Sequence, residues 1–226
     1  DITLNVGSGN TGTGGLVGIT AGTTTAGSGV GGAITLTSGD SNDGNTGAID
    51  LITDAGAAVT GAIGLTTGDS TGADSGTLTL ETGASTNGGK GGALTLSVGN
   101  AQTGAGGGIQ ATAGQTSGGA QGGFVQINGG VSAPNGGQGG YISLVSGAGT
   151  TRSSGKIVVK TVNAGTKGIS GALEFTSGAS TSGNSGEIKL TTGTGVLGKS
   201  GDITLNVGSG NTGTGGLVGI TAGTTT

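Results

Sequence analysis

The chain has 226 residues, of which eleven are acidic and seven basic, and three of its aspartates recur at equivalent places. Asp40, Asp54 and Asp69 each follow the start of a short repeat by six or seven residues. If the repeats stack, their carboxylates line up along one corner at about 4.8 Å. Calcium prefers such oxygen ligands, which gives the hypothesis of a calcium ladder. The alternative is that these aspartates favour turns and discourage edge pairing.

Other chemistry is restricted by what the composition lacks. The chain contains no His, Cys, Met or Trp, which removes imidazole and thiolate ligands, disulfides and histidine-based triads. Seven bases cannot form a nucleic-acid footprint, and no apolar run reaches the ~18 residues of a membrane span. Ser and Thr are too frequent for any single one to indicate a nucleophile. We therefore expect no enzyme, no cofactor apart from calcium, no nucleic-acid partner and no membrane span.

The chain repeats at two scales. Residues 1–25 recur without a change at 202–226, an offset of 201 residues. Between them runs a shorter repeat of 14 to 17 residues, recognised by an apolar-x-apolar segment near its beginning. The repeats start at Asp1, Leu16, Ala33, Ala48, Ala62, Thr77, Ala93, Gly108, Phe124, Tyr141, Lys156, Ala172, Glu187, Asp202 and Leu217.

Each repeat opens with an alternating pattern of apolar and polar residues. Position two is aliphatic in every repeat, and position four is aliphatic except for Ala111 and Phe175. Strict alternation predicts a short strand with one buried face. The expected core contains Ile2, Leu4, Ile34, Leu36, Ile63, Leu65, Leu94, Leu96, Ile142, Leu144, Leu173, Phe175, Ile188 and Leu190.

Glycine marks two fixed places in the repeat. The chain has 61 glycines, about one residue in four against a usual ~7%. Position seven is Gly in 13 of 15 repeats, with Asp54 and Val162 as the exceptions, and the residue before each new start is always Gly. Such glycines favour sharp corners, often with positive φ.

These features together predict an all-β fold, a β-solenoid of the parallel β-helix type. Each repeat would form one thin, two-sheet coil of about 15–16 residues, with Ile and Leu facing Gly, Ser and Ala. We expect residues 1–226 to form one continuous segment, with 1–201 as a super-repeat and 202–226 as the start of the next, within a longer array. An antiparallel sheet of hairpins is the second interpretation.

Aromatic and charged residues suggest lateral contacts. Phe124 and Tyr141 share position one of adjacent repeats, so they are expected to form a surface aromatic rung. The rung either shields the backbone or serves as a contact or glycan platform. Residues 1–81 contain eight acids and no base, whereas 90–199 contain seven bases and two acids. This asymmetry either is chance or steers one filament against another.

Blocks such as GALTLSVGNAQTGAGG and SGALEFTSGASTSGNSG resemble Gly/Ser/Thr-rich repeats of giant extracellular proteins of microalgae, diatoms among them. The resemblance covers the whole chain and implies a secreted or cell-surface fibre with an adhesive role. Stalks of bacterial surface adhesins are an alternative source of such repeats. The resemblance assigns no catalytic residue.

Three classes of function follow from the predicted fold. The first is a structural segment of a long extracellular fibre or stalk that associates with copies of itself end to end and side by side, with glycans or surfaces as further partners. The second is ice binding, for which Thr35 and Thr37 fit a flat face but Asp50 and Glu81 interrupt it. The third, a β-helix enzyme, needs clustered acids and bases that the sequence does not offer.

Overall fold

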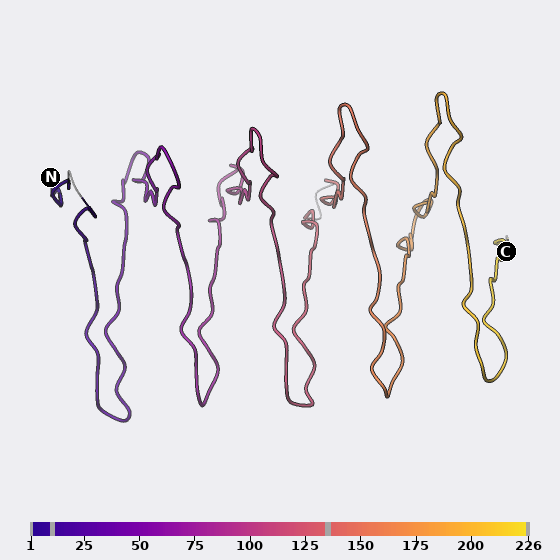
Figure 1. Ribbon diagram of the computed structural model, residues 1–226, viewed down its shortest axis with the longest axis horizontal. Coiled ribbons are helices and arrows are strands. Elements are labelled where there is room, and N and C mark those ends of the chain that lie inside the picture. Colours follow the sequence, from indigo (N-terminus) through magenta and orange to yellow (C-terminus); the bar gives the residue numbers. More distant parts are fainter. Residues whose placement is uncertain (1, 10–11, 134–136, 225–226) are drawn as a thin grey trace. The chain divides into compact units, whose positions relative to one another are not determined.

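The computed structural model describes residues 2–9, 12–133 and 137–224; Asp1, the predicted first residue of the first repeat, lies outside them. Within those ranges the chain forms no helix and no strand. Figure 1 shows a plain tube that runs out and back in successive open loops. The prediction of an all-β fold built from β-solenoid coils is therefore wrong.

The exposed surface confirms that the described part of the chain lacks a core. The accessible surface of the chain is 22294 Å². A compact globule of the chain's mass of 20.4 kDa would expose about 8,800 Å², and a fully extended chain about 29,600 Å². The structure therefore stands much nearer to the extended chain, and no apolar side chain among the described residues is buried.

The residues expected to form the core are all exposed. Their exposed fractions run from 51% for Ile34 and Leu173 to 93% for Ile2. The prediction of a buried core is therefore wrong for Ile2, Leu4, Ile34, Leu36, Ile63, Leu65, Leu94, Leu96, Ile142, Leu144, Leu173, Phe175, Ile188 and Leu190. The alternation of apolar and polar residues is real, but none of these apolar side chains is buried by the part of the chain that the structure describes.

The physical reason lies in the balance between burial and entropy. Each repeat offers two aliphatic side chains, while ordering a coil would fix some fifteen residues, about a quarter of them glycine. Closing a loop of about ten residues on itself is a smaller entropic demand than aligning whole coils. The repeats therefore close locally instead of forming continuous ladders. The flat face on which the ice-binding hypothesis rested depended on those ladders, and that hypothesis is not carried further.

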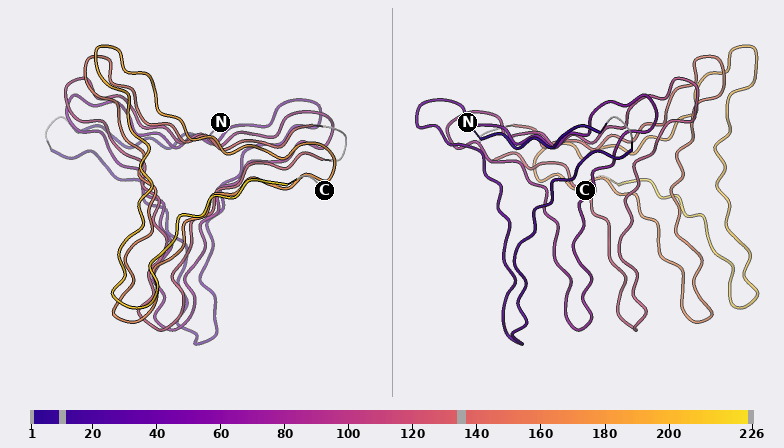
Figure 2. Two further views of the ribbon diagram at one scale, coloured as in Figure 1. Left: turned by 90° about the vertical axis from the view of Figure 1, so that its right-hand side faces the viewer. Right: turned by 60° about the vertical axis from the view of Figure 1, so that its left-hand side comes forward.

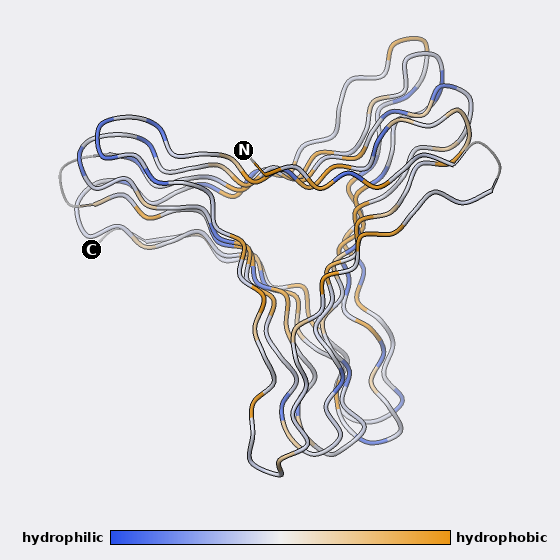
Figure 3. Cartoon of the chain, turned by 90° about the vertical axis from the view of Figure 1, so that its left-hand side faces the viewer, coloured by the Kyte–Doolittle hydropathy of each residue, from blue (hydrophilic) through white to orange (hydrophobic). Residues whose placement is uncertain are grey.

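The repeats appear as loops joined by short apolar segments. In both views of Figure 2, the two limbs of each loop run beside one another. Figure 3 shows the hydrophobic colour mainly on the segments that join successive loops, while the limbs and tips are mostly pale or blue. The sequence pattern of positions two and four is thus segregated in space from the polar loops, although it is not buried.

The chain divides into two parts, Asp1–Gln110 and Ala111–Thr226. Each part contains a copy of the recurring 25-residue sequence. The two copies share a positive φ at equivalent glycines, 94° at Gly12 and 79° at Gly213. The predicted extents of the super-repeats, 1–201 and 202–226, remain predictions.

Candidate functional site

The best-defined structure in each repeat is the place where a loop closes, which we call the neck. The neck consists of the residues at positions six and seven and the glycine before the next start, which we call the closing glycine. In six repeats the closing glycine N–H donates to the carbonyl of position seven. The N···O distances are 2.8 Å for Gly32 to Gly22, 3.0 Å for Gly47 to Gly39, 3.5 Å for Gly92 to Gly83, 2.9 Å for Gly123 to Gly114, 2.8 Å for Gly140 to Gly130 and 2.9 Å for Gly155 to Gly147.

In half of the repeats the closing glycine lies so close to position six or to the adjoining backbone that a side chain would be crowded. A Cβ atom on Gly107 would lie 2.8 Å from Val98 Cγ1, and one on Gly92 would lie 3.1 Å from Thr82 Cβ. All 14 closing glycines have position six or the adjoining backbone within 4 Å of an added Cβ, in seven repeats at less than 3.4 Å and in the other seven at ordinary van der Waals distance. Close approach therefore accounts for glycine in the first seven repeats, and nothing in the structure explains it in the others.

Position seven is different, because its glycines have free space around them. A Cβ on Gly99, Gly114 or Gly147 would meet nothing within 4 Å. The two repeats that replace this glycine, with Asp54 and Val162, therefore need no rearrangement of the neck. Position seven therefore accepts residues with a side chain because the space around it is free.

The neck also contains most of the partly covered residues of the chain. Seven described residues are only partly exposed, and all but Ser132 stand at position six. The six are Ala21, Ser38, Ala113, Gly129, Ser146 and Ser177. In another repeat the position-six hydroxyl of Thr82 donates to the carbonyl of Gly92 at 3.0 Å, which adds a second link across the neck.

Positive φ angles occur at the loops and not at the necks. The glycines with positive φ among the described residues are Gly12, Gly88, Gly168, Gly183 and Gly213. Each stands eleven or twelve residues after the start of its repeat. Leu197 also has a positive φ of 62°, which is unfavourable for a residue with a Cβ. Glycine thus permits close approach at half of the necks, whereas in these loops it permits a positive φ.

The predicted calcium ligands take part in local hydrogen bonds. The Asp40 carboxylate accepts the N–H of Ser41 at 2.8 Å, and the Asp54 carboxylate accepts that of Ala55 at 2.8 Å. Within the ranges that the structure describes, no three acidic side chains gather in a way that could hold a metal ion. The ladder of Asp40, Asp54 and Asp69 presupposed stacked coils, so it stays an untested prediction.

The predicted aromatic rung is not distinguished by burial. Phe124 is 83% exposed and Tyr141 is 89% exposed. Both begin a repeat, as the sequence indicates, and both are open to a contact from outside the chain. Their stacking against one another stays a prediction.

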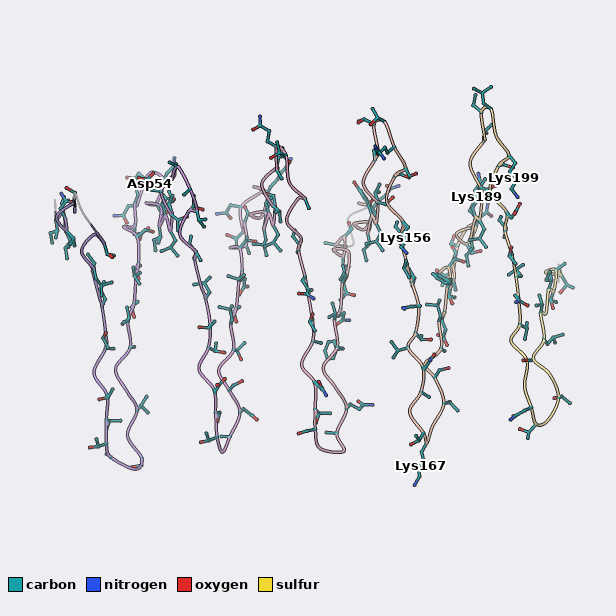
Figure 4. The ribbon with its side chains drawn as sticks, viewed as in Figure 1. Asp54, Lys156, Lys167, Lys189 and Lys199 are labelled. Carbon is teal, nitrogen blue, oxygen red and sulfur yellow. The ribbon has the colours of Figure 1, made fainter. Side chains whose placement is uncertain are left out.

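One ion pair was missed by the sequence reasoning. Lys199 Nζ lies 3.0 Å from Asp202 Oδ2, and both side chains are exposed. Figure 4 labels Lys199, near the carboxylate that it contacts. The signal was present as opposite charges three residues apart, in the sequence KSGD, on either side of closing glycine Gly201.

The described part of the chain contains no pocket. None of its residues belongs to a helix with the length and hydropathy needed to cross a bilayer. The neck is therefore the candidate functional element, and its chemistry is hydrogen bonding and close backbone contact. No protein-family model, no curated protein sequence and no solved structure matches this chain.

Proposed function

We propose that this chain is a structural, non-catalytic segment of a long extracellular or cell-surface fibre. The observation that carries the proposal is that the 14 closing glycines lie beside position six or seven of their own repeat, and six of them also donate a hydrogen bond to position seven. The same closing contact recurs in copies 201 residues apart, between Gly15 and Val6 and between Gly216 and Val207. A module that closes on itself can be added many times without changing its neighbours, which is how length is built.

The exposed aliphatic pairs supply the means of association. They recur in the same register in every repeat, and in the single chain they remain open to water. Large exposed apolar surfaces mark interaction sites. Copies of this chain carry the same pattern at the same spacing and are therefore matched partners, end to end or side by side.

The site of action follows from the composition and from the resemblance to microalgal fibre repeats. A chain without Cys and Met offers few groups to oxidants, which suits exposure outside the cell. The exposed rings of Phe124 and Tyr141 are available for an adhesive contact with glycans or surfaces.

Two measurements test the proposal. The purified chain should sediment as elongated assemblies whose size increases with concentration, and negative-stain electron micrographs should show thin, unbranched filaments. Antibodies raised against residues 137–224 should label the outside of intact cells that make the protein. A concentration-independent monomer, or label confined to the cell interior, would contradict the proposal.

A further inference from the structure

We propose that the acidic segment, residues 33–76, of one copy binds the basic segment, residues 141–171, of a second copy, so that neighbouring chains are offset by about half a super-repeat. The inference rests on the proposed function, because it specifies how associating copies recognise one another. It identifies the partner as a second copy of this chain and the recognition as charge pairing.

The two segments carry opposite charges, and each contains charged residues of one sign only. The acidic segment contains six aspartates and no base, and the basic segment contains four bases and no acid. The aspartates are Asp40, Asp43, Asp50, Asp54, Asp69 and Asp74, and the bases are Arg152, Lys156, Lys160 and Lys167. In a chain with so few charges, these ten are more than half of the total of eighteen.

Among the described residues, these charges have no ionic partner. Both segments lie wholly within the described residues, and every one of the ten side chains is exposed. The ion pair that the described residues form, Lys199 with Asp202, lies outside both segments. In Figure 4 Lys167 extends from the tip of a loop, away from the backbone, where a second chain can reach it.

The charges determine how far one chain is shifted along the other, which the apolar residues alone do not determine. Because the aliphatic pairs recur in every repeat, a shift of one chain by any whole number of repeats brings pair against pair equally well. With no shift, the six aspartates of two copies face each other and repel. Asp54 and Lys156 are 102 residues apart, close to half of the 201-residue super-repeat. A shift of that size places the acidic segment of one copy beside the basic segment of the other, and the two segments attract each other.

The same complementarity also permits the two segments to meet within one chain. Pairing inside a chain would neutralise the charges without joining copies, and its strength would not depend on protein concentration. The experiment must therefore separate contacts within a chain from contacts between chains.

The first experiment reverses two charges at matched net charge. K156E/K160E is compared with K90E/K189E; each double variant lowers the net charge from −4 to −8, since each reversal removes two units. In sedimentation at low salt, we expect K156E/K160E to need about tenfold more protein to associate, with K90E/K189E close to the unaltered chain. Raising the salt to 0.5 M should weaken association of the unaltered chain, because charges are then screened within a few ångströms.

The second experiment identifies the contact. Equal amounts of unlabelled and ¹⁵N-labelled chain are mixed, and carboxylates are coupled to lysines with a zero-length carbodiimide. Peptides from residues 33–76 joined to peptides from 141–171 should appear as mixed-isotope pairs. Pairs of one isotope only would show that the contact lies within a chain and would overturn the inference.

The outcomes separate the inference from the proposed function. If assemblies form but K156E/K160E behaves like K90E/K189E, or if the mixed-isotope cross-links are scattered along the chain, the charge offset is wrong and the fibre proposal stands. If no assembly forms at any salt concentration, both are wrong.

Discussion

The necks and the aliphatic pairs are equally regular in sequence, yet the structure treats them differently. Closing glycines meet position six at van der Waals distance or closer, and several are hydrogen bonded to position seven. The aliphatic pairs remain largely exposed, Ile142 by 52% and Leu144 by 69%. The closing glycine thus has a contact within its own repeat, whereas the aliphatic pairs stay largely uncovered.

This difference teaches that a repeated pattern has two possible causes. One is a contact that each repeat makes with itself, and it requires nothing beyond some fifteen residues. The other is a contact with a different molecule, which imposes the same register on every repeat. The necks belong to the first kind, and under the fibre proposal the aliphatic pairs belong to the second.

The largest expected effect comes from removing one aliphatic pair. I142S/L144S should raise the protein concentration needed for assembly by about a hundredfold or more, because each buried aliphatic side chain contributes roughly 1.5–3 kcal/mol. The control V131S/V196S removes two aliphatic side chains outside positions two and four and should change assembly by less than about threefold. Sedimentation measures both, and equal effects would show that the register of the pairs does not matter.

Next comes the steric requirement of the neck. Gly123→Ala places a Cβ about 3.1 Å from the Gly114 nitrogen and should open the neck, whereas Gly114→Ala enters free space. Losing the hydrogen bond from residue 123 should reduce the protection of its amide from hydrogen exchange by about 2- to 12-fold. Exchange monitored by NMR, corrected for intrinsic rates, measures the change. Unchanged protection in Gly123→Ala, or a comparable loss in Gly114→Ala, would contradict the steric argument.

A smaller effect is expected from the hydroxyl at position six. Thr82→Val keeps the shape of the side chain but removes the hydrogen bond to the Gly92 carbonyl. The Gly92 amide should lose protection by about threefold, since a neutral hydrogen bond contributes about 1 kcal/mol or less when exposed. Thr67→Val is the matched control at position six of the preceding repeat, and the Gly92 amide should not respond to it.

The smallest effect concerns the ion pair beside closing glycine Gly201. Asp202→Asn should remove the contact with Lys199 and change exchange at Gly201 by less than about twofold, because exposed pairs contribute little. The side-chain resonances of Lys199 should move, while those of Lys167 stay unchanged. A large change in exchange at Gly201 would show that the ion pair restrains this neck more than an exposed pair should.

The sequence predicts the boundaries of the repeats and the importance of the closing glycine, because both depend on contacts between residues about nine apart. It does not predict what covers Ile142 or Leu144, since alternation shows only that one face is apolar. The partner of such a face is non-local, and the β-solenoid prediction supplied that partner from neighbouring repeats. The structure shows that loop closure takes precedence in a single chain.

The sequence located the two fixed glycines of the neck but did not predict their role. Both fixed glycines were expected to serve as corners with positive φ, but positive φ occurs at residues such as Gly88 and Gly168. Composition alone cannot separate a glycine needed for conformation from one needed for close approach. The sequence does contain a signal, because the closing glycine is never replaced, while position seven accepts Asp54 and Val162.

Closure at the neck has a practical consequence for engineering. Because each loop is held at its base, the residues beyond the base are free to change in number, and natural repeats already differ between 14 and 17 residues. The entropic cost of closing a loop rises only slowly with its length, by about 0.6 kcal/mol for each doubling. Foreign peptides grafted at these tips would be displayed at regular intervals along the chain, with the supporting scaffold left as it was.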